Sequence, residues 1–156
     1  MSPMIGPTPE QGRELALPGV IAQGGRRGWT AALVAGVLFG GVTLIIPALL
    51  SREDALGFLA ILLAMIGAVY LAFVLQDGRR REFGIEYVGM VVFTVLAMVG
   101  LAREQPMVLA AGYLGHGLWD IMHGPRGIHT RIPWWYAPLC LGFDGVLGAY
   151  MLIRFL

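Results

Sequence analysis

Apolar residues run through most of the chain, and short polar breaks divide these runs into five segments. A helix needs about 20 predominantly apolar residues to cross a bilayer. Five segments approach or meet this length, and they cover residues 29–50, 55–75, 83–101, 106–122 and 133–156. Because the breaks between them are short, the pattern predicts an all-α protein, a bundle of five antiparallel transmembrane helices. No segment shows a competing strand pattern, and a sheet in lipid would have to close into a barrel.

Composition supports a polytopic membrane protein and excludes one class of partner. Of the 156 residues, 57% are hydrophobic and 13% are charged, with a mean hydropathy of +0.72. This is too apolar for an ordinary water-soluble domain, so the lipid bilayer is the expected surrounding. The net charge is only +1, and no extended basic block is present, so we expect no nucleic-acid partner.

The arginines predict how the helices are oriented, because short cytoplasmic loops carry an excess of positive residues. If the N-terminus is cytoplasmic, the arginines on the cytoplasmic side are Arg13, Arg26, Arg27, Arg79, Arg80, Arg81, Arg126 and Arg131, against Arg52, Arg103 and Arg154 outside. We therefore predict a multi-pass protein of a bacterial cytoplasmic (inner) membrane. Residues 1–28, which are rich in proline and glycine, are predicted to form a flexible cytoplasmic tail before a transmembrane domain of residues 29–156.

Small residues mark the faces through which these helices are expected to pack. In lipid, helices associate by close packing, and small residues spaced four apart allow it. The first segment carries Ala32, Gly36, Gly40 and Gly41, the fourth Ala111 and Gly115, and the fifth Gly142, Gly145 and Gly148. These faces serve either contacts within the bundle or a homo-oligomer formed through the first and fifth helices.

Ionisable residues gather on the last three segments. His116, Asp120 and His123 are spaced i, i+4 and i+7, which places them on one stripe of a helix. His123 is expected at the cytoplasmic end and His116 about 10 Å deeper. Asp144 is expected near the bilayer middle, close to the level of His116, and Glu86 in the cytoplasmic half, level with Asp120 or His123. The spacing thus predicts one polar pocket that opens toward the cytoplasm.

Such a pocket suggests chemistry, because ionisable groups inside a membrane are costly and are by default candidates for function. His116, Asp120 and His123 are the candidate ligands of a divalent metal ion, and haem with His116 or His123 as an axial ligand is the weaker alternative. No His-Glu-x-x-His motif supports the divalent ion. The alternative is metal-free acid and base catalysis by His116, Asp120, His123, Asp144 and Glu86. Taken singly, each of these residues is better explained by a structural role. The set taken together favours function, because carboxylates from separate helices inside a membrane are costly to retain for packing alone.

Aromatic residues and one loop histidine complete the predicted pocket. The candidate substrate-binding residues are Trp119, Trp135, Tyr136, Phe143 and His129, with Trp134 as a further aromatic wall. The competing interpretation for Trp134, Trp135 and Tyr136 is anchoring at the membrane interface, where aromatic belts lie. For His129, it is an exposed position in the loop before the last helix.

One segment carries a resemblance. The pattern His116-x-x-Trp119-Asp120-x-x-His123, followed by Trp135, Cys140, Asp144 and Gly148, resembles small uncharacterised bacterial integral membrane proteins with a similar segment before a final helix that contains an aspartate. The likeness covers the last third of the chain and brings no established activity. It implies a shared polar site at His116, Asp120, His123 and Asp144.

The leading functional hypothesis is an integral membrane enzyme that acts on a lipid-soluble or amphipathic small molecule. Two alternatives stay open. The first is a small oligomeric carrier coupled to protons or ions, because chains of acidic residues and histidines form proton relays in membranes. The second is a noncatalytic membrane subunit that binds a partner or a pigment.

Overall fold

The computed structural model describes residues 20–78, 80–123 and 127–155 as a helical bundle. Its helices are α2 (Val20–Thr43), α3 (Ile45–Leu49), α4 (Arg52–Asp77), α5 (Arg80–Ala102), α6 (Pro106–Met122) and α7 (Tyr136–Phe155). The described residues contain no strand, which confirms the all-α prediction for them. Of the predicted tail, residues 1–19 lie outside the described residues, and residues 20–28 belong to α2, which breaks from helical geometry at Gly25.

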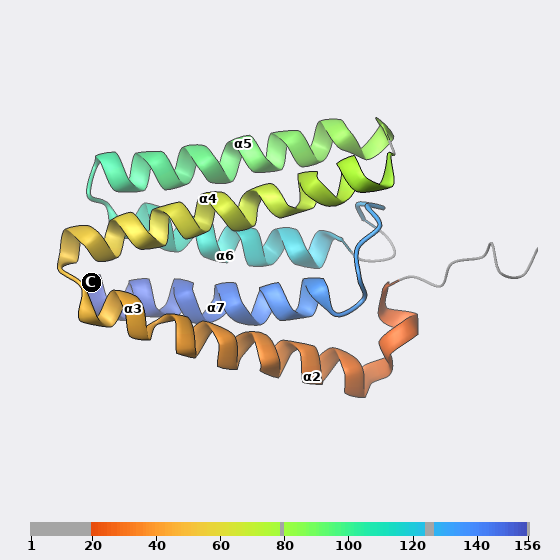
Figure 1. Ribbon diagram of the computed structural model, residues 1–156, viewed down its shortest axis with the longest axis horizontal. Coiled ribbons are helices and arrows are strands. Elements are labelled where there is room, and N and C mark those ends of the chain that lie inside the picture. Colours follow the sequence, from red (N-terminus) through yellow and green to blue (C-terminus); the bar gives the residue numbers. More distant parts are fainter. Residues whose placement is uncertain (1–19, 79, 124–126, 156) are drawn as a thin grey trace, which may run out of the picture.

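The long helices lie roughly antiparallel (Figure 1). Helix α7 packs between α2 and α6, and α5 packs against both α4 and α6. The beginnings of α2, α5 and α7 and the ends of α4 and α6 lie at one end of the bundle. The α3–α4 and α5–α6 turns lie at the other end, with the end of α7 (Figure 1).

Local sequence explains where α4 begins and ends. The Ser51 side chain accepts a hydrogen bond from the backbone N–H of Asp54, and acidic residues in the first turn suit the positive end of the helix dipole. At the other end, Gly78 takes a left-handed conformation with φ of 67°, and its N–H donates to the Val74 carbonyl. Glycine adopts this conformation without a side-chain clash, so the chain can turn at once into α5.

A proline interrupts the first apolar helix near its end. Pro47 has no backbone N–H to donate to the carbonyl of Thr43, four residues earlier. Helix α2 ends at Thr43, and the short α3 continues from Ile45 to Leu49. The interruption is slight, because Leu44 keeps right-handed helical angles and its carbonyl still accepts from Ala48.

Glycines bring α2 and α7 together. A Cβ added at Gly36 would lie 1.9 Å from the carbonyl oxygen of Leu139, and one added at Gly142 would lie 2.4 Å from that of Leu33. The backbones therefore touch where these side chains are missing. Gly41 and Gly145, in contrast, face open space. Of the predicted small-residue faces, Gly36 and Gly142 thus serve contacts within the chain, whereas Gly41 and Gly145 have no neighbour within 4 Å of an added Cβ.

The outer surface of the bundle is apolar, as a lipid-facing surface must be. Large hydrophobic side chains stand out from several helices, among them Leu38, Ile61, Met98, Leu118 and Ile153. Within the described residues, four helical stretches are long and apolar enough to cross a membrane: Gly25–Leu49, Arg52–Asp77, Glu82–Ala102 and Tyr136–Phe155. The chain is a membrane protein. Helix α6, the fourth of the predicted spans, has 17 residues.

The interior divides into an apolar part and a polar part. The apolar core consists of Leu56, Leu59, Ala60, Leu63, Ala97, Leu109, Ala110, Tyr113, Phe143, Leu147 and Met151. The buried polar residues are Glu86, His116, Asp120, His123, Thr130 and Asp144. These come from α5, α6, α7 and the connection before α7, so the helices that enclose the apolar core also enclose the candidate site.

Candidate functional site

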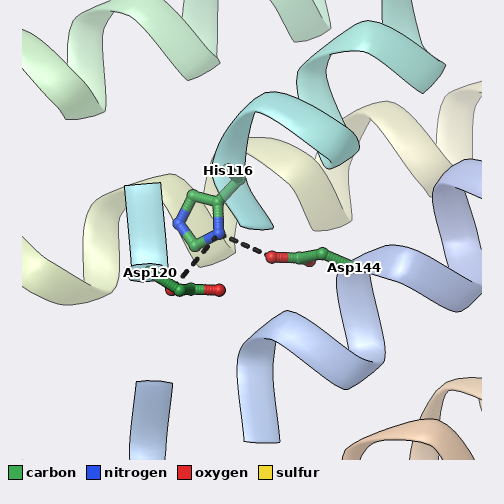
Figure 2. A group of neighbouring side chains, drawn as sticks. All are labelled: His116, Asp120 and Asp144. Carbon is green, nitrogen blue, oxygen red and sulfur yellow. Dashed lines mark hydrogen bonds and ion pairs between the residues drawn. The ribbon is translucent and has the colours of Figure 1, made fainter. Parts of the chain in front are cut away.

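One imidazole and two carboxylates meet between α6 and α7 (Figure 2). The Nδ1 atom of His116 lies 2.7 Å from Oδ2 of Asp144 and 3.9 Å from Oδ1 of Asp120. The side chains of all three residues are almost completely excluded from solvent. We call these three residues the inner group. Its potential ligand atoms all lie within 4.8 Å of one another, so they can contact a single metal ion.

Helical spacing and small residues build the inner group. His116 and Asp120 are four residues apart on α6, so their side chains lie on the same face. Asp144 reaches them from α7 because the two helices approach closely at glycines. A Cβ added at Gly117 would lie 3.7 Å from Cβ of Asp144, and one added at Gly148 would lie 2.8 Å from the side chain of Leu114.

Each member of the inner group keeps one buried polar atom without a hydrogen-bond partner among the described residues. These atoms are Nε2 of His116, Oδ2 of Asp120 and Oδ1 of Asp144. Buried polar atoms in proteins are nearly always paired, and each exception needs an explanation. Three exceptions in one place indicate that the group can accept a further ligand or proton.

Tyr70 on α4 also belongs to the site, although the spacing of ionisable residues did not predict it. Its hydroxyl donates to Oδ1 of Asp120 at 2.6 Å, and the residue is 1% exposed. A signal was present, because Tyr70 is the one residue of the 55–75 segment whose side chain carries a strong hydrogen-bonding group. In a lipid-embedded helix, such a group favours a partner inside the bundle.

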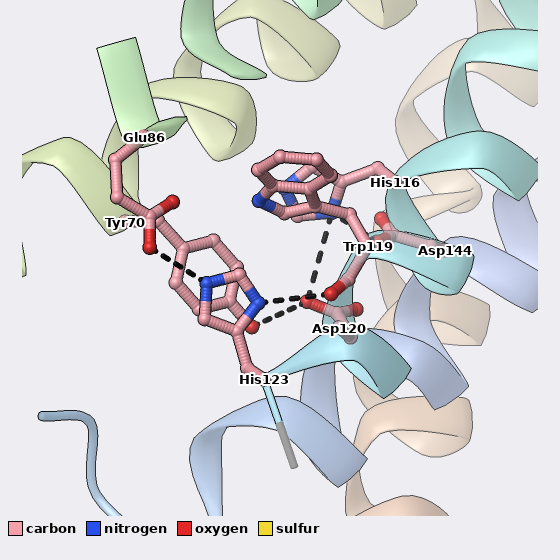
Figure 3. Close-up of polar contacts among 7 residues, drawn as sticks. All are labelled: Tyr70, Glu86, His116, Trp119, Asp120, His123 and Asp144. Atoms are coloured by element: carbon pink, nitrogen blue, oxygen red, sulfur yellow. Dashed lines mark hydrogen bonds and ion pairs between the residues drawn. The ribbon is translucent and has the colours of Figure 1, made fainter. Parts of the chain in front are cut away.

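A second polar group, the outer group, consists of Glu86, His123 and Thr130 (Figure 3 shows the first two). Nε2 of His123 lies 2.8 Å from Oε1 of Glu86, and the same oxygen accepts from the hydroxyl of Thr130. The Nδ1–H of His123 donates to the backbone carbonyl of Trp119 at 2.9 Å. Thr130 is a second residue that the sequence analysis did not single out.

The structure therefore distributes the predicted stripe over two groups. His123 caps the end of α6 with φ of −79° and ψ of 26°, where helical spacing no longer fixes the direction of the side chain. It points toward Glu86, and both of its ring nitrogens have partners. The expected metal ligands were His116, Asp120 and His123, but among the described residues those within ligand distance of one another are His116, Asp120 and Asp144.

The predicted substrate-binding aromatic residues take different positions. Trp119 packs on Phe93 and His123 and covers Gly89, and Tyr136 packs its ring edge-on against Tyr70. Both rings thus border the polar groups. Phe143 stacks on Phe39 of α2 and is part of the apolar core.

The remaining predicted residues lie near the end of the bundle. Trp135 is 43% exposed, and His129 is also exposed. Trp134 is half-buried and contacts Gly28 of α2, where an added Cβ would lie 3.0 Å from its ring. In the described part of the chain, neither His129 nor Trp135 forms a hydrogen bond with either polar group.

We expect the outer group to hold the α6–α7 connection against the bundle. The change Thr130→Val keeps the shape of the side chain but removes the hydroxyl that donates to Glu86. Loss of one partner from a buried hydrogen-bonded group costs about 1–3 kcal/mol. Amide hydrogen exchange in residues 127–135 should therefore become faster. The control Thr30→Val removes only the hydrogen bond from the Thr30 hydroxyl to the Arg26 carbonyl, in an exposed turn of α2. It should leave amide exchange in residues 127–135 unchanged. Equal exchange in both variants would contradict the proposed role of the outer group.

Comparison with known proteins gives a family but no function. No curated protein sequence and no solved structure matches the chain. The sequence profile of the Family of unknown function (DUF6010) matches residues 31–155. The match runs from within α2 to the end of α7 and so includes both the inner and the outer group. The chain belongs to the family of unknown function DUF6010.

Proposed function

We propose that the protein is an integral membrane enzyme in which His116, Asp120 and Asp144 bind a divalent metal ion that acts on a lipid-soluble or amphipathic substrate. The observation that supports this most is the burial of two carboxylates and one imidazole within ligand distance, with one unpaired polar atom on each. Buried charges in proteins are normally paired or coordinate metals.

The charge of the inner group favours a cation. Two ionised carboxylates with a neutral imidazole carry two negative charges, and repulsion in a buried site makes this state costly. A divalent ion neutralises both charges, whereas a single shared proton neutralises only one. When no metal is bound, the shared proton lies between Nδ1 of His116 and Oδ2 of Asp144, which are 2.7 Å apart.

Three protein ligands leave room for chemistry. Structural zinc sites are normally closed by four protein ligands, whereas catalytic sites keep one position for water or substrate. A metal held by one nitrogen and two carboxylates can lower the pKa of a bound water and polarise a substrate oxygen. Trp119 and Tyr136, which border the polar groups, then provide apolar contacts for the substrate. Glu86 and His123 lie outside the ligand set, and their proposed part is to accept or deliver protons.

The proposed setting is the cytoplasmic membrane of a bacterium, with the N-terminus inside. In this arrangement α6 crosses the membrane as the fourth of five helices, and its 17 residues are compatible with a short span. Arg131 contacts Asp77 at the end of α4, and the end of α4 is at the same end of the bundle as the beginning of α2 (Figure 1). The positive-inside rule assigns this end to the cytoplasm.

Metal analysis of the purified protein tests the proposal. We expect about one divalent ion per chain, and loading of metal-free protein with Zn²⁺ should release a proton, because ligands must lose their protons to bind. Elemental analysis gives the metal content, and a pH indicator in weakly buffered detergent solution records the proton. If the purified chain neither retains nor takes up a divalent ion, the proposed metal enzyme is rejected. Acid and base catalysis without a metal then remains as the alternative.

One observation favours a second candidate, a proton-coupled carrier. Protonatable groups lie in series: His123 of the outer group stacks on Tyr70, the Tyr70 hydroxyl donates to Asp120, and His116 lies near both Asp120 and Asp144. Proton relays in carriers use such series. Since the bundle is small, transport would take place in an oligomer, for which the uncovered glycines Gly41 and Gly145 offer a contact face. A pH gradient is applied to vesicles that contain the reconstituted protein, and the acidification of their interior is measured. Acidification that depends on the gradient and is lost in Glu86→Gln would support the carrier.

A further inference from the structure

Tyr70 is the point at which α4 reaches the inner group. Its hydroxyl donates to Oδ1 of Asp120 at 2.6 Å, across 50 positions of sequence (Figure 3). The partner atom is buried, and the other carboxylate oxygen, Oδ2, has no hydrogen-bond partner in the described part of the chain. The hydrogen bond therefore distinguishes the two oxygens of Asp120.

We propose that Tyr70 is a positioning residue for metal binding, which holds Asp120 through Oδ1 and keeps Oδ2 free for the ion. This inference rests on the metal site proposed above. Residues that hydrogen-bond to a metal ligand fix its orientation and tune its basicity. A carboxylate between two helices can rotate about its side-chain bonds, and the Tyr70 hydroxyl stops this rotation.

The ring of Tyr70 is itself held firmly, as a positioning role requires. It stacks on the imidazole of His123, with ring centroids 3.8 Å apart and an angle of 19° between the planes. Phe73 and Tyr136 contact it edge-on, with centroid distances of 6.4 and 5.6 Å. The outer group thus acts on the inner group through this ring, and His123 has a part in metal binding without being a ligand.

A matched tyrosine allows positioning to be separated from packing. Tyr113 on α6 is also buried, and its hydroxyl donates at 2.6 Å to the backbone carbonyl of Leu59. Tyr70→Phe and Tyr113→Phe each remove one buried hydroxyl, but only the first removes a hydrogen bond to a proposed ligand. Both full-length variants are purified in detergent, and their Zn²⁺ affinity is measured by competition with a chelator.

We expect Tyr70→Phe to weaken Zn²⁺ binding by about 10–100-fold, the usual effect of losing a partner of a metal ligand. The visible absorption of bound Co²⁺ should also change in Tyr70→Phe, because the carboxylate geometry changes. Tyr113→Phe should retain the affinity and the spectrum of the unmodified protein. Equal affinities in the two variants would overturn the positioning role and leave the metal site intact. Absence of Zn²⁺ binding by the unmodified chain would overturn both proposals.

A second measurement covers the case in which Tyr70→Phe does not fold. Difluorotyrosine placed at position 70 keeps the ring and the hydroxyl but makes the hydroxyl a stronger donor. We expect it to shift the Co²⁺ spectrum, whereas the same replacement at position 113 should not. A spectrum that is unchanged by difluorotyrosine at position 70 would overturn the positioning role.

Discussion

Asp144→Asn is expected to abolish metal binding and, with it, the proposed activity. Asparagine nearly matches aspartate in shape but removes the negative charge that faces Nδ1 of His116 at 2.7 Å. Loss of a partner outside the ligand set costs about 10–100-fold in metal affinity, so loss of a ligand should exceed about 100-fold. The stabilisation that Zn²⁺ gives to the folded protein should disappear as well, since a ligand stabilises only the state that binds it.

Thermal unfolding with and without Zn²⁺ measures both effects of Asp144→Asn. The matched control is Asp54→Asn, the same chemical change at an exposed residue in the first turn of α4. We expect the control to retain a Zn²⁺-dependent rise in Tm. The assignment of Asp144 as a ligand is wrong if its variant keeps that rise.

Gly36→Ala is expected to loosen the contact between α2 and α7. The new methyl group would lie 1.9 Å from the carbonyl oxygen of Leu139 and 2.8 Å from the carbonyl carbon. Both are backbone atoms, so they cannot move aside as a flexible side chain does. Overpacking typically costs about 1–3 kcal/mol, and a forced separation of two backbones belongs at or above the upper end of this range.

The midpoint of thermal unfolding in detergent checks this expectation, with Gly41→Ala as the control. Gly41 lies on the same helix, and nothing lies within 4 Å of an added Cβ. Since alanine favours a helix over glycine by about 0.5–1 kcal/mol, the control should keep or slightly raise the midpoint. A similar midpoint in both variants would contradict the close packing of α2 on α7.

The helical architecture could be predicted from sequence because each helix is determined locally. Continuous apolar stretches cannot satisfy their backbone in lipid except as helices. Ser51, Gly78 and Pro106 mark helix ends by chemistry that acts within a few residues. The level of Asp144 relative to His116 also follows from counting residues along two helices, and the structure places them in contact.

The membership of the two polar groups depends on tertiary structure. Helical spacing placed His116, Asp120 and His123 on one stripe, yet His123 lies where α6 ends and its direction is set by Glu86 and the carbonyl of Trp119. Phe143 neighbours Asp144 in sequence but turns toward Phe39 on α2.

By itself, the sequence determined a helical membrane protein with ionisable residues at matching levels of its last helices. Only the tertiary structure decided that Asp144 joins His116 and Asp120, that Tyr70 holds Asp120, and that Thr130 joins Glu86. The physical reason is the distance along the sequence over which each kind of interaction acts. Helix formation depends on neighbours within one or two turns, whereas these contacts join residues 28 to 50 positions apart. For Asp144, the geometry also depends on how closely Gly117 and Gly148 let α6 and α7 approach.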